Sequence, residues 1–584
     1  VRRRAQIHSR QDAAEWQGQE AIMRIRRQGF LSTTLGVVFC ASLGMAMSAS
    51  AVRAQNSSQG SAGAAGSSAS ANGAANDAPG SDATNAKDDA AILQELEQMR
   101  ARIAELEAQL KAKSAHSAVA SAPPAMLNSA AAPANAASNA NVAADASAQE
   151  TMAAPATAAE NKPAKAEPFA FADFTWLNGN SREKTPPIDT LFFTPEFRAD
   201  TAYIYDFNHP ADDTIGGSSE VFRAQEVQLT QLGIGGDFHY DNVRGRLMTQ
   251  FGMYSQTTPR NDASPARGQW NLADAYRYLS EAYGGYHWNA LRGVNLDAGI
   301  FMSYVGLFSY YNFDNWAYQP SYVSSNTPWF FNGVRAQFFV TDKLKIEPWF
   351  INGWQSYGRF NNKPGLGGQI LWRPTGWFEF VGNQYGLGQD DLGVLGRSRI
   401  HTDDSIQVKY FDRPDRTVDK MAFSLTGDLG CEYGGGVSCH GNTRGGPKQS
   451  FVGYMVYDRI WLDRDKFGLT FGGGKINNPG RYLVLLPPIN GATAASGTPY
   501  FTENPGQPFK AWDASGTFDY MPSQYITFRT EFDHRAANVP YFSGPGGITP
   551  PEGNTGAPGS VVPGWTPDLK KIENRIDLAI MVKF

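Results

Sequence analysis

Long apolar runs are missing from most of this sequence. After residue 55, no stretch approaches the roughly 20 apolar residues that a membrane-spanning helix needs. Any membrane insertion of the later chain must therefore use strands. An excess of one charge is also missing, because 51 Lys and Arg residues stand against 56 Asp and Glu residues, for a net charge of −5. This mildly acidic balance argues against nucleic acid as a partner.

One apolar run does occur near the start, and it has the features of a secretory signal peptide. Met23 begins a basic stretch, and a long apolar segment rich in small side chains follows it. The pattern predicts a signal peptide over residues 23–54, with a retained membrane anchor as the alternative. The polar, arginine-rich residues 1–22 look like an over-extended translation start. The surroundings of Cys40 do not match a lipidation site.

Cysteine is scarce, with three residues in the whole sequence. Cys431 and Cys439 would remain after signal cleavage, and they flank a glycine-rich bend in "CEYGGGVSC". An exported chain meets an oxidising compartment, so this spacing predicts a disulfide-closed loop. A metal site that includes His440 is the alternative, although such a set is one ligand short of a structural zinc site. No metal or other cofactor is expected.

A short helical segment lies between two low-complexity segments. Residues 55–87 and 114–167 are dominated by Ala, Ser, Asn, Gly and Pro and are expected to be disordered linkers. Residues 88–113 have the heptad pattern of a coiled coil, and Glu95 and Arg100 would attract each other across a parallel interface. We therefore predict self-association as a homotrimer or a dimer, with packing onto the same chain as the alternative. The oligomerisation seam consists of Ile92, Leu96, Met99, Ile103, Leu106 and Leu110.

From residue 168 to residue 584, short segments with alternating apolar and polar side chains replace the helical pattern. In "YITFRTEFDHR", Ile526 and Phe528 alternate with Arg529 and Glu531. Successive side chains of a strand point to opposite faces, so such segments suit a sheet with lipid on one side and water on the other. We predict sixteen strands, near residues 190–207, 226–241, 243–257, 276–289, 293–306, 327–341, 344–358, 365–376, 378–389, 398–414, 419–430, 448–463, 466–478, 511–524, 525–537 and 574–584.

The connections between these segments alternate between short and long. Tight turns are predicted at "DN", "ALR", "DK", "TG" and "RDK", and most other connections are longer. Outer-membrane barrels have this asymmetry, with an even strand number, short periplasmic turns and long external loops. Because backbone groups in lipid must all be paired, the sheet must close, and about sixteen strands enclose a lumen wide enough for water. The predicted fold class is all-β, a transmembrane antiparallel β-barrel of about 16 strands over residues 168–584, with the coiled coil in the periplasm.

The last residues of the sequence, "NRIDLAIMVKF", form one more alternating strand with a wholly apolar face. An alternating strand that ends in Phe is typical of the C-terminal signal by which the barrel-insertion machinery recognises outer-membrane proteins. The predicted insertion signal, which should also face lipid, consists of Ile576, Leu578, Ile580, Val582 and Phe584. Aromatic girdles at the membrane interfaces are expected to include Trp349, Trp354, Trp372, Trp377, Tyr454, Tyr457 and Trp461.

Long stretches of the later chain also resemble a known family. They include "FADFTWLNGNSREKTPPIDTLFFTPEFRADTAYIYDFNHP", "LGIGGDFHYDNVRGRLMTQFGMYSQTTPRNDASPARGQWNL" and "GIFMSYVGLFSYYNFDNWAYQPSYVSSNTPWFFNG". These segments resemble the OmpL-like putative β-barrel porin family of Gram-negative bacteria, over essentially all of residues 168–584. The resemblance implies an outer-membrane barrel with pore activity, and it supplies no catalytic residues. The expected function is passive diffusion of small hydrophilic solutes, with a structural or adhesive barrel, or an envelope tether, as the alternative.

The third long loop, at residues 307–326, is the candidate for the narrowest part of the pore, by analogy with general porins. It is rich in aromatic side chains and carries a single charge. Aromatic faces stack on sugar rings, so a preference for saccharides is one hypothesis. Packing of the rings against the barrel or a neighbouring subunit is the commoner use of such clusters. The constriction candidates are Tyr310, Tyr311, Phe313, Asp314, Trp316 and Tyr318.

Charges of both signs are predicted to face the lumen. Lys345 and Glu347 share one strand face, and Arg529, Glu531 and Asp533 share another. Because no ring of one sign is visible, we expect modest ion selectivity. Enzymatic activity is not expected, since none of the six histidines of the predicted barrel lies in a recognisable nucleophile context.

Overall fold

The computed structural model describes residues 167–218, 220–259, 262–361, 363–389, 395–441, 448–479, 487–492 and 508–584. The predicted signal peptide, the first linker, the coiled-coil segment with its seam, and all but the last residue of the second linker lie outside these residues. In the part of the chain that the structure describes, no helix is both long enough and apolar enough to cross a membrane.

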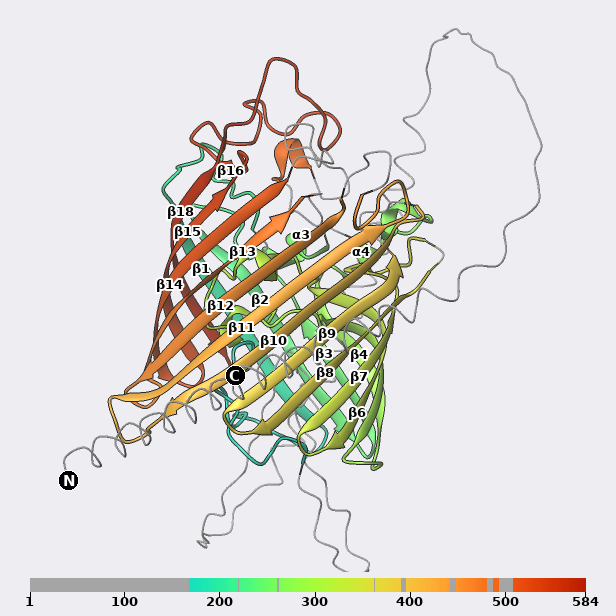
Figure 1. Cartoon of the computed structure of the whole chain (residues 1–584), viewed down its shortest axis with the longest axis vertical. Coiled ribbons are helices and arrows are strands. Elements are labelled where there is room, and N and C mark those ends of the chain that lie inside the picture. The colour runs from blue at the N-terminus through green and yellow to red at the C-terminus, as the bar shows by residue number, and fades with distance from the viewer. Residues whose placement is uncertain are drawn as a thin grey trace, which may run out of the picture. The chain divides into compact units, whose positions relative to one another are not determined.

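Sixteen antiparallel strands form a closed barrel (Figure 1). Each strand pairs with its neighbours in chain order, and the first strand closes the sheet by pairing with the last, for example at Ala199 and Val582. The predicted fold class and strand number are therefore confirmed. The barrel strands are β1 (Phe193–Asp206), β2 (Val227–Tyr240), β3 (Val243–Thr249), β4 (Leu279–Trp288), β5 (Val294–Met302), β6 (Phe330–Thr341), β7 (Leu344–Ile351), β8 (Gly365–Thr375), β9 (Phe378–Gln389), β10 (Ser398–Asp412), β11 (Val418–Tyr433), β12 (Ser450–Leu462), β13 (Phe467–Asn478), β14 (Phe509–Ser523), β15 (Ile526–Ala537) and β18 (Ile572–Lys583).

The other elements of the described residues lie in the connections between these strands. They are the short helices α3 (Tyr254–Thr257), α4 (Leu272–Tyr276) and α5 (Tyr322–Ser325), the 3-10 turns η2 (Ser264–Ala266), η3 (Asn312–Asp314) and η4 (Ile489–Gly491), and a separate two-stranded ladder of β16 (Phe542–Ser543) and β17 (Leu569–Lys570). Two predicted strands extended by seven or eight residues past the C-terminal end of the observed strand. The strand predicted at 243–257 ends at Thr249, and α3 takes up its last residues, while the strand predicted at 344–358 ends at Ile351.

The two ends of the barrel differ in the length of their connections. At one end, which we call the turn end, successive strands are joined by two to five residues, as at 241–242, 342–343 and 413–417. At the other, which we call the loop end, the connections are longer, and they stand at the top of Figure 1. The chain enters β1 and leaves β18 at the turn end, where Phe197 and Phe584 pair through their backbones. Residues 168–192, predicted as part of the barrel domain, contain no strand and lie at this end.

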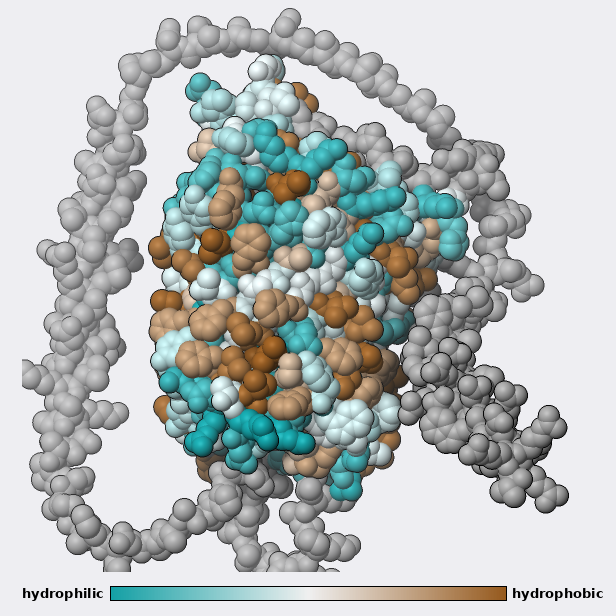
Figure 2. Space-filling view, turned by 60° about the vertical axis from the view of Figure 1, so that its left-hand side comes forward, coloured by the Kyte–Doolittle hydropathy of each residue, from teal (hydrophilic) through white to brown (hydrophobic). Residues whose placement is uncertain are grey.

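Alternating side chains give the barrel an apolar outer face and a polar inner face. In β18, Leu578 and Ile580 expose 43% and 50% of their surface, whereas Asp577 and Met581, on either side of this pair, are fully buried. Figure 2 shows apolar side chains gathered in a band on the outer face, with polar side chains towards both rims. A sheet with this polarity can meet lipid outside and water inside.

The aromatic residues predicted for the interface girdles divide between the two faces. Trp372, Trp377 and Tyr454 are exposed, as girdle residues should be. The prediction was wrong for the others, which are buried inside the barrel: Trp349, Trp354, Tyr457 and Trp461. Strand parity explains the difference for two of them, because Tyr454 and Tyr457 lie an odd number of residues apart in β12 and so must face opposite ways.

Candidate functional site: the narrowed lumen

The long connection between β5 and β6, residues 303–329, folds into the barrel, and we call it the inner loop. In the closed sheet of sixteen strands, β6 lies directly opposite β14, whose neighbours are β13 and β15. The inner loop nevertheless bonds to these opposite strands, since the guanidinium of Arg529 on β15 donates to the carbonyl of Asn315 at 2.6 Å. It also reaches β1, where Arg198 and Asp314 form an ion pair at 2.9 Å. The inner loop therefore crosses the lumen from one side to the other.

A buried charge triad on the barrel wall holds the centre of the inner loop. Asp519 pairs with Arg459 at 2.8 Å and with Arg529 at 2.7 Å, and all three side chains are buried. Arg459 in turn donates to the carbonyl of Trp316 at 3.2 Å. Hydrogen bonds that involve charged groups are stronger than neutral ones, so this triad fixes the backbone of the loop at two places.

Two further carboxylates bind backbone N–H groups of the same loop. The two oxygens of Glu531 accept from the N–H groups of Tyr318 at 2.6 Å and Gln319 at 2.7 Å. Asp513 accepts from the hydroxyl of Ser321 at 2.8 Å and from the N–H of Tyr322 at 3.0 Å, at the start of α5. Carboxylates that accept backbone N–H bonds order the segment that donates them.

The six predicted constriction residues all lie in the inner loop, and all are buried. The hydroxyls of Tyr310, Tyr311 and Tyr318 have protein partners, among them Thr258 at 3.0 Å for Tyr310 and Asp200 at 3.0 Å for Tyr318. Burial raises the pKa of each of these phenols well above its usual value, so they stay neutral hydrogen-bonding groups.

The remaining rings of the inner loop also pack on protein groups. Trp316 makes an edge contact with Trp461 on β12, with 5.5 Å between ring centroids. The guanidinium of Arg182 lies 4.8 Å from the ring centroid of Phe313, and that of Arg198 lies 4.0 Å from the centroid of Tyr311. The rings that sequence analysis considered for sugar stacking thus form the packed interior of the loop.

The predicted lumen charges face inward and are buried, but they lie at two separate places. Lys345 and Glu347 pair with each other on β7. Arg529, Glu531 and Asp533 lie on β15 beneath the inner loop. No pattern in the sequence indicated that the loop binds Asp519, Arg459 and Arg198, although each falls at an inward-facing position of its strand.

Three buried carboxylates, those of Glu531, Asp533 and Asp577, offer oxygens within 4.8 Å of one another. Both oxygens of Glu531 already accept N–H bonds from the inner loop. The guanidinium of Arg575 lies near the other two, 3.8 Å from Asp533 and 3.7 Å from Asp577. This cluster therefore anchors the inner loop through Glu531, and the guanidinium of Arg575 offsets part of its negative charge.

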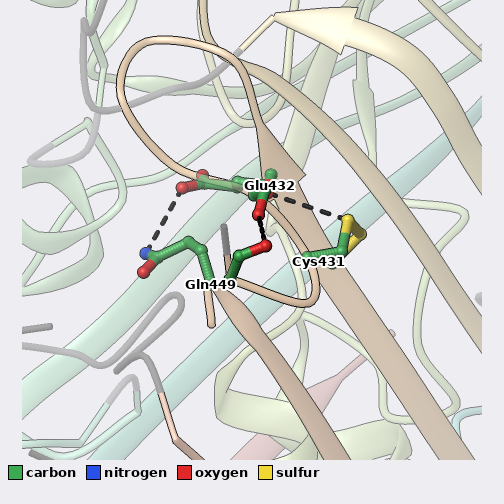
Figure 3. The surroundings of a disulfide bond; sticks show 6 residues. Cys431, Glu432 and Gln449 are labelled. Carbon is green, nitrogen blue, oxygen red and sulfur yellow. Dashed lines mark hydrogen bonds between the residues drawn. A yellow bond between two sulfur atoms is a disulfide. The ribbon is translucent and has the colours of Figure 1, made fainter. Parts of the chain in front are cut away.

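At the loop end, Cys431 and Cys439 are joined by a disulfide bond. Figure 3 shows its surroundings, where Gln449 bonds to Glu432 through backbone and side chain, the backbone N–H of Glu432 donating at 2.9 Å. Glu432 also pairs with Arg399 of β10. The disulfide bond joins the end of β11 to the first residues of the loop between β11 and β12.

The five residues of the predicted insertion signal lie on the outer face of β18 and at the residue that follows it. Leu578, Ile580 and Phe584 are exposed. The ring of Phe584 stacks on that of Phe197 of β1, with 5.1 Å between centroids. Phe584 therefore adds a ring contact to the pairing of β1 with β18.

The sequence profile of the family described as putative beta-barrel porin-2, OmpL-like, matches residues 198–557. No match was found among curated proteins. Solved structures similar in fold include OprB of Pseudomonas putida at high pH (12% identity, 67% of this chain and 94% of that one, TM-score 0.38). Others are the outer membrane channel DcaP of Acinetobacter baumannii (13%, 67% and 96%, 0.36) and an anion-selective porin from Comamonas acidovorans (10%, 67% and 99%, 0.38).

Proposed function

Because the chain belongs to the putative beta-barrel porin-2, OmpL-like family, we propose that it is an outer-membrane porin for the passive diffusion of small hydrophilic solutes. The observation that carries the proposal is the closed sheet of sixteen strands with an apolar outer face and a charged inner face. A barrel of this size encloses an aqueous channel. A loop that crosses the lumen reduces the cross-section of such a channel and so limits the size of the solute.

The charges of the lumen support a pore that takes neutral or weakly charged solutes. Acidic and basic side chains of the lumen wall pair with each other, as in the triad of Asp519, Arg459 and Arg529 beneath the inner loop and in the separate pair of Lys345 and Glu347. Opposite charges in contact cancel each other's field over a short distance. The ion selectivity of the pore should therefore be modest.

The orientation follows from the asymmetry of the connections. The turn end faces the periplasm and the loop end faces the outside, as in other bacterial barrels. The heptad segment at residues 88–113 then lies in the periplasm, where it joins barrels into a homotrimer or a dimer. The apolar outer strand face of β18, ending at Phe584, is the part that the insertion machinery recognises.

Swelling of liposomes in sugar solutions tests the proposal. Vesicles with the folded full chain should swell in a monosaccharide, swell more slowly in di- and trisaccharides, and match empty vesicles in a large dextran. Swelling indistinguishable from that of empty vesicles, with protein that is folded and inserted, would support the structural or adhesive barrel instead.

Saccharides as the preferred solutes need a separate test, because the rings of the inner loop are packed on the protein. Maltooligosaccharides added to a conducting planar bilayer would block the current in proportion to their binding. If the current is not blocked, the preference for saccharides is rejected, and the proposal of a general pore for small hydrophilic solutes is kept.

A further inference from the structure

Residues 167–186, which we call the turn-end segment, cross the turn end of the barrel. The N–H of Phe169 donates to the carbonyl of Asp342 in the turn between β6 and β7, at 2.8 Å. Thirteen residues later, Arg182 donates to the carbonyls of Ser523 and Ile526, at 2.7 and 2.6 Å, where β14 turns into β15. These two turns lie opposite each other in the closed sheet, so the segment spans the mouth.

The middle of the segment is buried inside the barrel. Phe174, Trp176 and Leu177 each expose 4% of their surface or less, and they belong to one apolar cluster with inward-facing residues such as Leu371 of β8 and Met521 of β14. The indole N–H of Trp176 donates to the carbonyl of Gly376 at 3.2 Å. A chain segment that only passed the rim would not bury three large apolar side chains among strands from different parts of the wall.

The turn-end segment also contacts the inner loop directly. Asn178 accepts from the N–H of Trp316 through its side chain at 2.8 Å, and the N–H of Gly179 donates to the carbonyl of Asp314 at 3.1 Å. Gly179 has a φ of +78°, and a Cβ there would lie 2.3 Å from the carbonyl oxygen of Leu307. The two segments therefore form one layered obstruction with no room for a side chain between them.

The end of the segment is fastened to the last strand of the barrel. The ammonium of Lys583 pairs with Glu183 at 2.9 Å and donates to the hydroxyl of Ser181 at 2.7 Å, and all three side chains are buried. The segment has no strand pairing of its own, so the sheet would stay closed if these side-chain contacts opened.

We propose that the turn-end segment is a gate. In the described state it narrows the turn end of the lumen to a path of low conductance, and the pore conducts fully when the segment leaves the inner loop. This inference rests on the proposed function, since a gate requires a pore. The limiting barrier to conduction then lies at the turn end, below the inner loop. The close contact between Gly179 and Leu307 holds the turn-end segment against the inner loop in this state.

Single-channel recording in planar bilayers tests the gate with the full chain and three changes. Deletion of residues 167–186 should raise the conductance several-fold. The full chain should reach this higher level only in brief openings, which we call excursions. In the double variant Glu183→Cys with Lys583→Cys, a short bismaleimide cross-linker should abolish these excursions. Gly179→Ala should make them more frequent than Gly268→Ala does. Gly268 is a matched control, with a φ of +90° and no atom within 4 Å of an added Cβ.

The outcomes separate the gate from the pore. If the deletion variant conducts like the full chain, or if the cross-linked protein still rises briefly to the higher conductance, the gate is refuted. The proposed porin function is then unaffected. If neither the full chain nor the deletion variant conducts, although both are folded and inserted, the proposed porin function is refuted. The gate is then refuted as well. Should the deletion prevent folding, equal excursion frequencies in Gly179→Ala and Gly268→Ala refute the gate.

Discussion

Replacing Asp519 by Asn should release the inner loop while leaving the barrel intact. Asp519 is the shared partner of Arg459 and Arg529, and these arginines donate to the carbonyls of Trp316 and Asn315 in the loop. Asn has nearly the same shape, but it removes the negative charge and turns an N–H₂ group towards one guanidinium. Two buried arginines are then left to repel each other.

The size of the effect follows from the burial of the triad. Breaking a buried ion pair by removing one partner costs about 3–5 kcal/mol. If this cost falls on the attached state of the loop, the detached fraction rises roughly 100- to 4,000-fold. Chymotrypsin cleavage within residues 303–329, measured by mass spectrometry on protein in liposomes, reports this fraction when opening is fast relative to cleavage.

Asp458→Asn provides the matched control. Asp458 lies on β12 next to Arg459 but on the other face, where it accepts from the exposed hydroxyl of Tyr410 at 3.0 Å. This variant should be cleaved at the wild-type rate. If Asp519→Asn is also cleaved at that rate, while remaining folded and inserted, the triad does not hold the inner loop and the reasoning is refuted.

Four further changes have defined outcomes. Trp176→Ala should cost about 3–5 kcal/mol of local stability and raise conductance noise, and quiet recordings would contradict the burial of this ring between segment and wall. Cys431→Ser should destabilise the loop it closes by about 2.5 kcal/mol, seen as faster proteolysis there, whereas an unchanged rate would show that the disulfide is dispensable. Deleting residues 88–113 should weaken oligomers on native gels without loss of the heat-modifiable barrel band, and an unchanged oligomer would refute the role of the heptads. Phe584→Ala, which removes a stacking contact with Phe197 worth about 0.5–1.5 kcal/mol, should lower the yield of inserted barrel, and an unchanged yield would show that the final ring is not needed.

The barrel was predictable because its rules are local. Alternation in segments such as residues 572–583 assigns lipid and lumen faces one strand at a time, and a two-residue turn such as 342–343 leaves the chain little choice but a hairpin. Closure then follows from the demand that every backbone group be paired in lipid. The inward placement of Lys345, Glu347 and Glu531 came from the same parity.

The site was less predictable because it depends on contacts between distant parts of the chain. Asn178 and Trp316 meet across 138 positions, and Arg182 meets Ser523 across 341, and no periodicity relates such pairs. Residues 168–192 were assigned to the barrel domain, with no strand predicted before residue 190, and no pattern in the sequence indicated that Phe174 and Trp176 are buried in the lumen. The need for glycine at position 179 becomes visible only in the folded structure, where the carbonyl of Leu307 leaves no room for a Cβ.

The current through a planar bilayer that contains the purified, folded full chain tests the central claim most directly. We expect discrete conductance steps, reduced by small polyethylene glycols that enter the lumen and unaffected by large ones that the inner loop excludes. A bilayer that stays silent, with protein shown to be inserted as a folded barrel, would contradict the claim that this sheet surrounds a path for water.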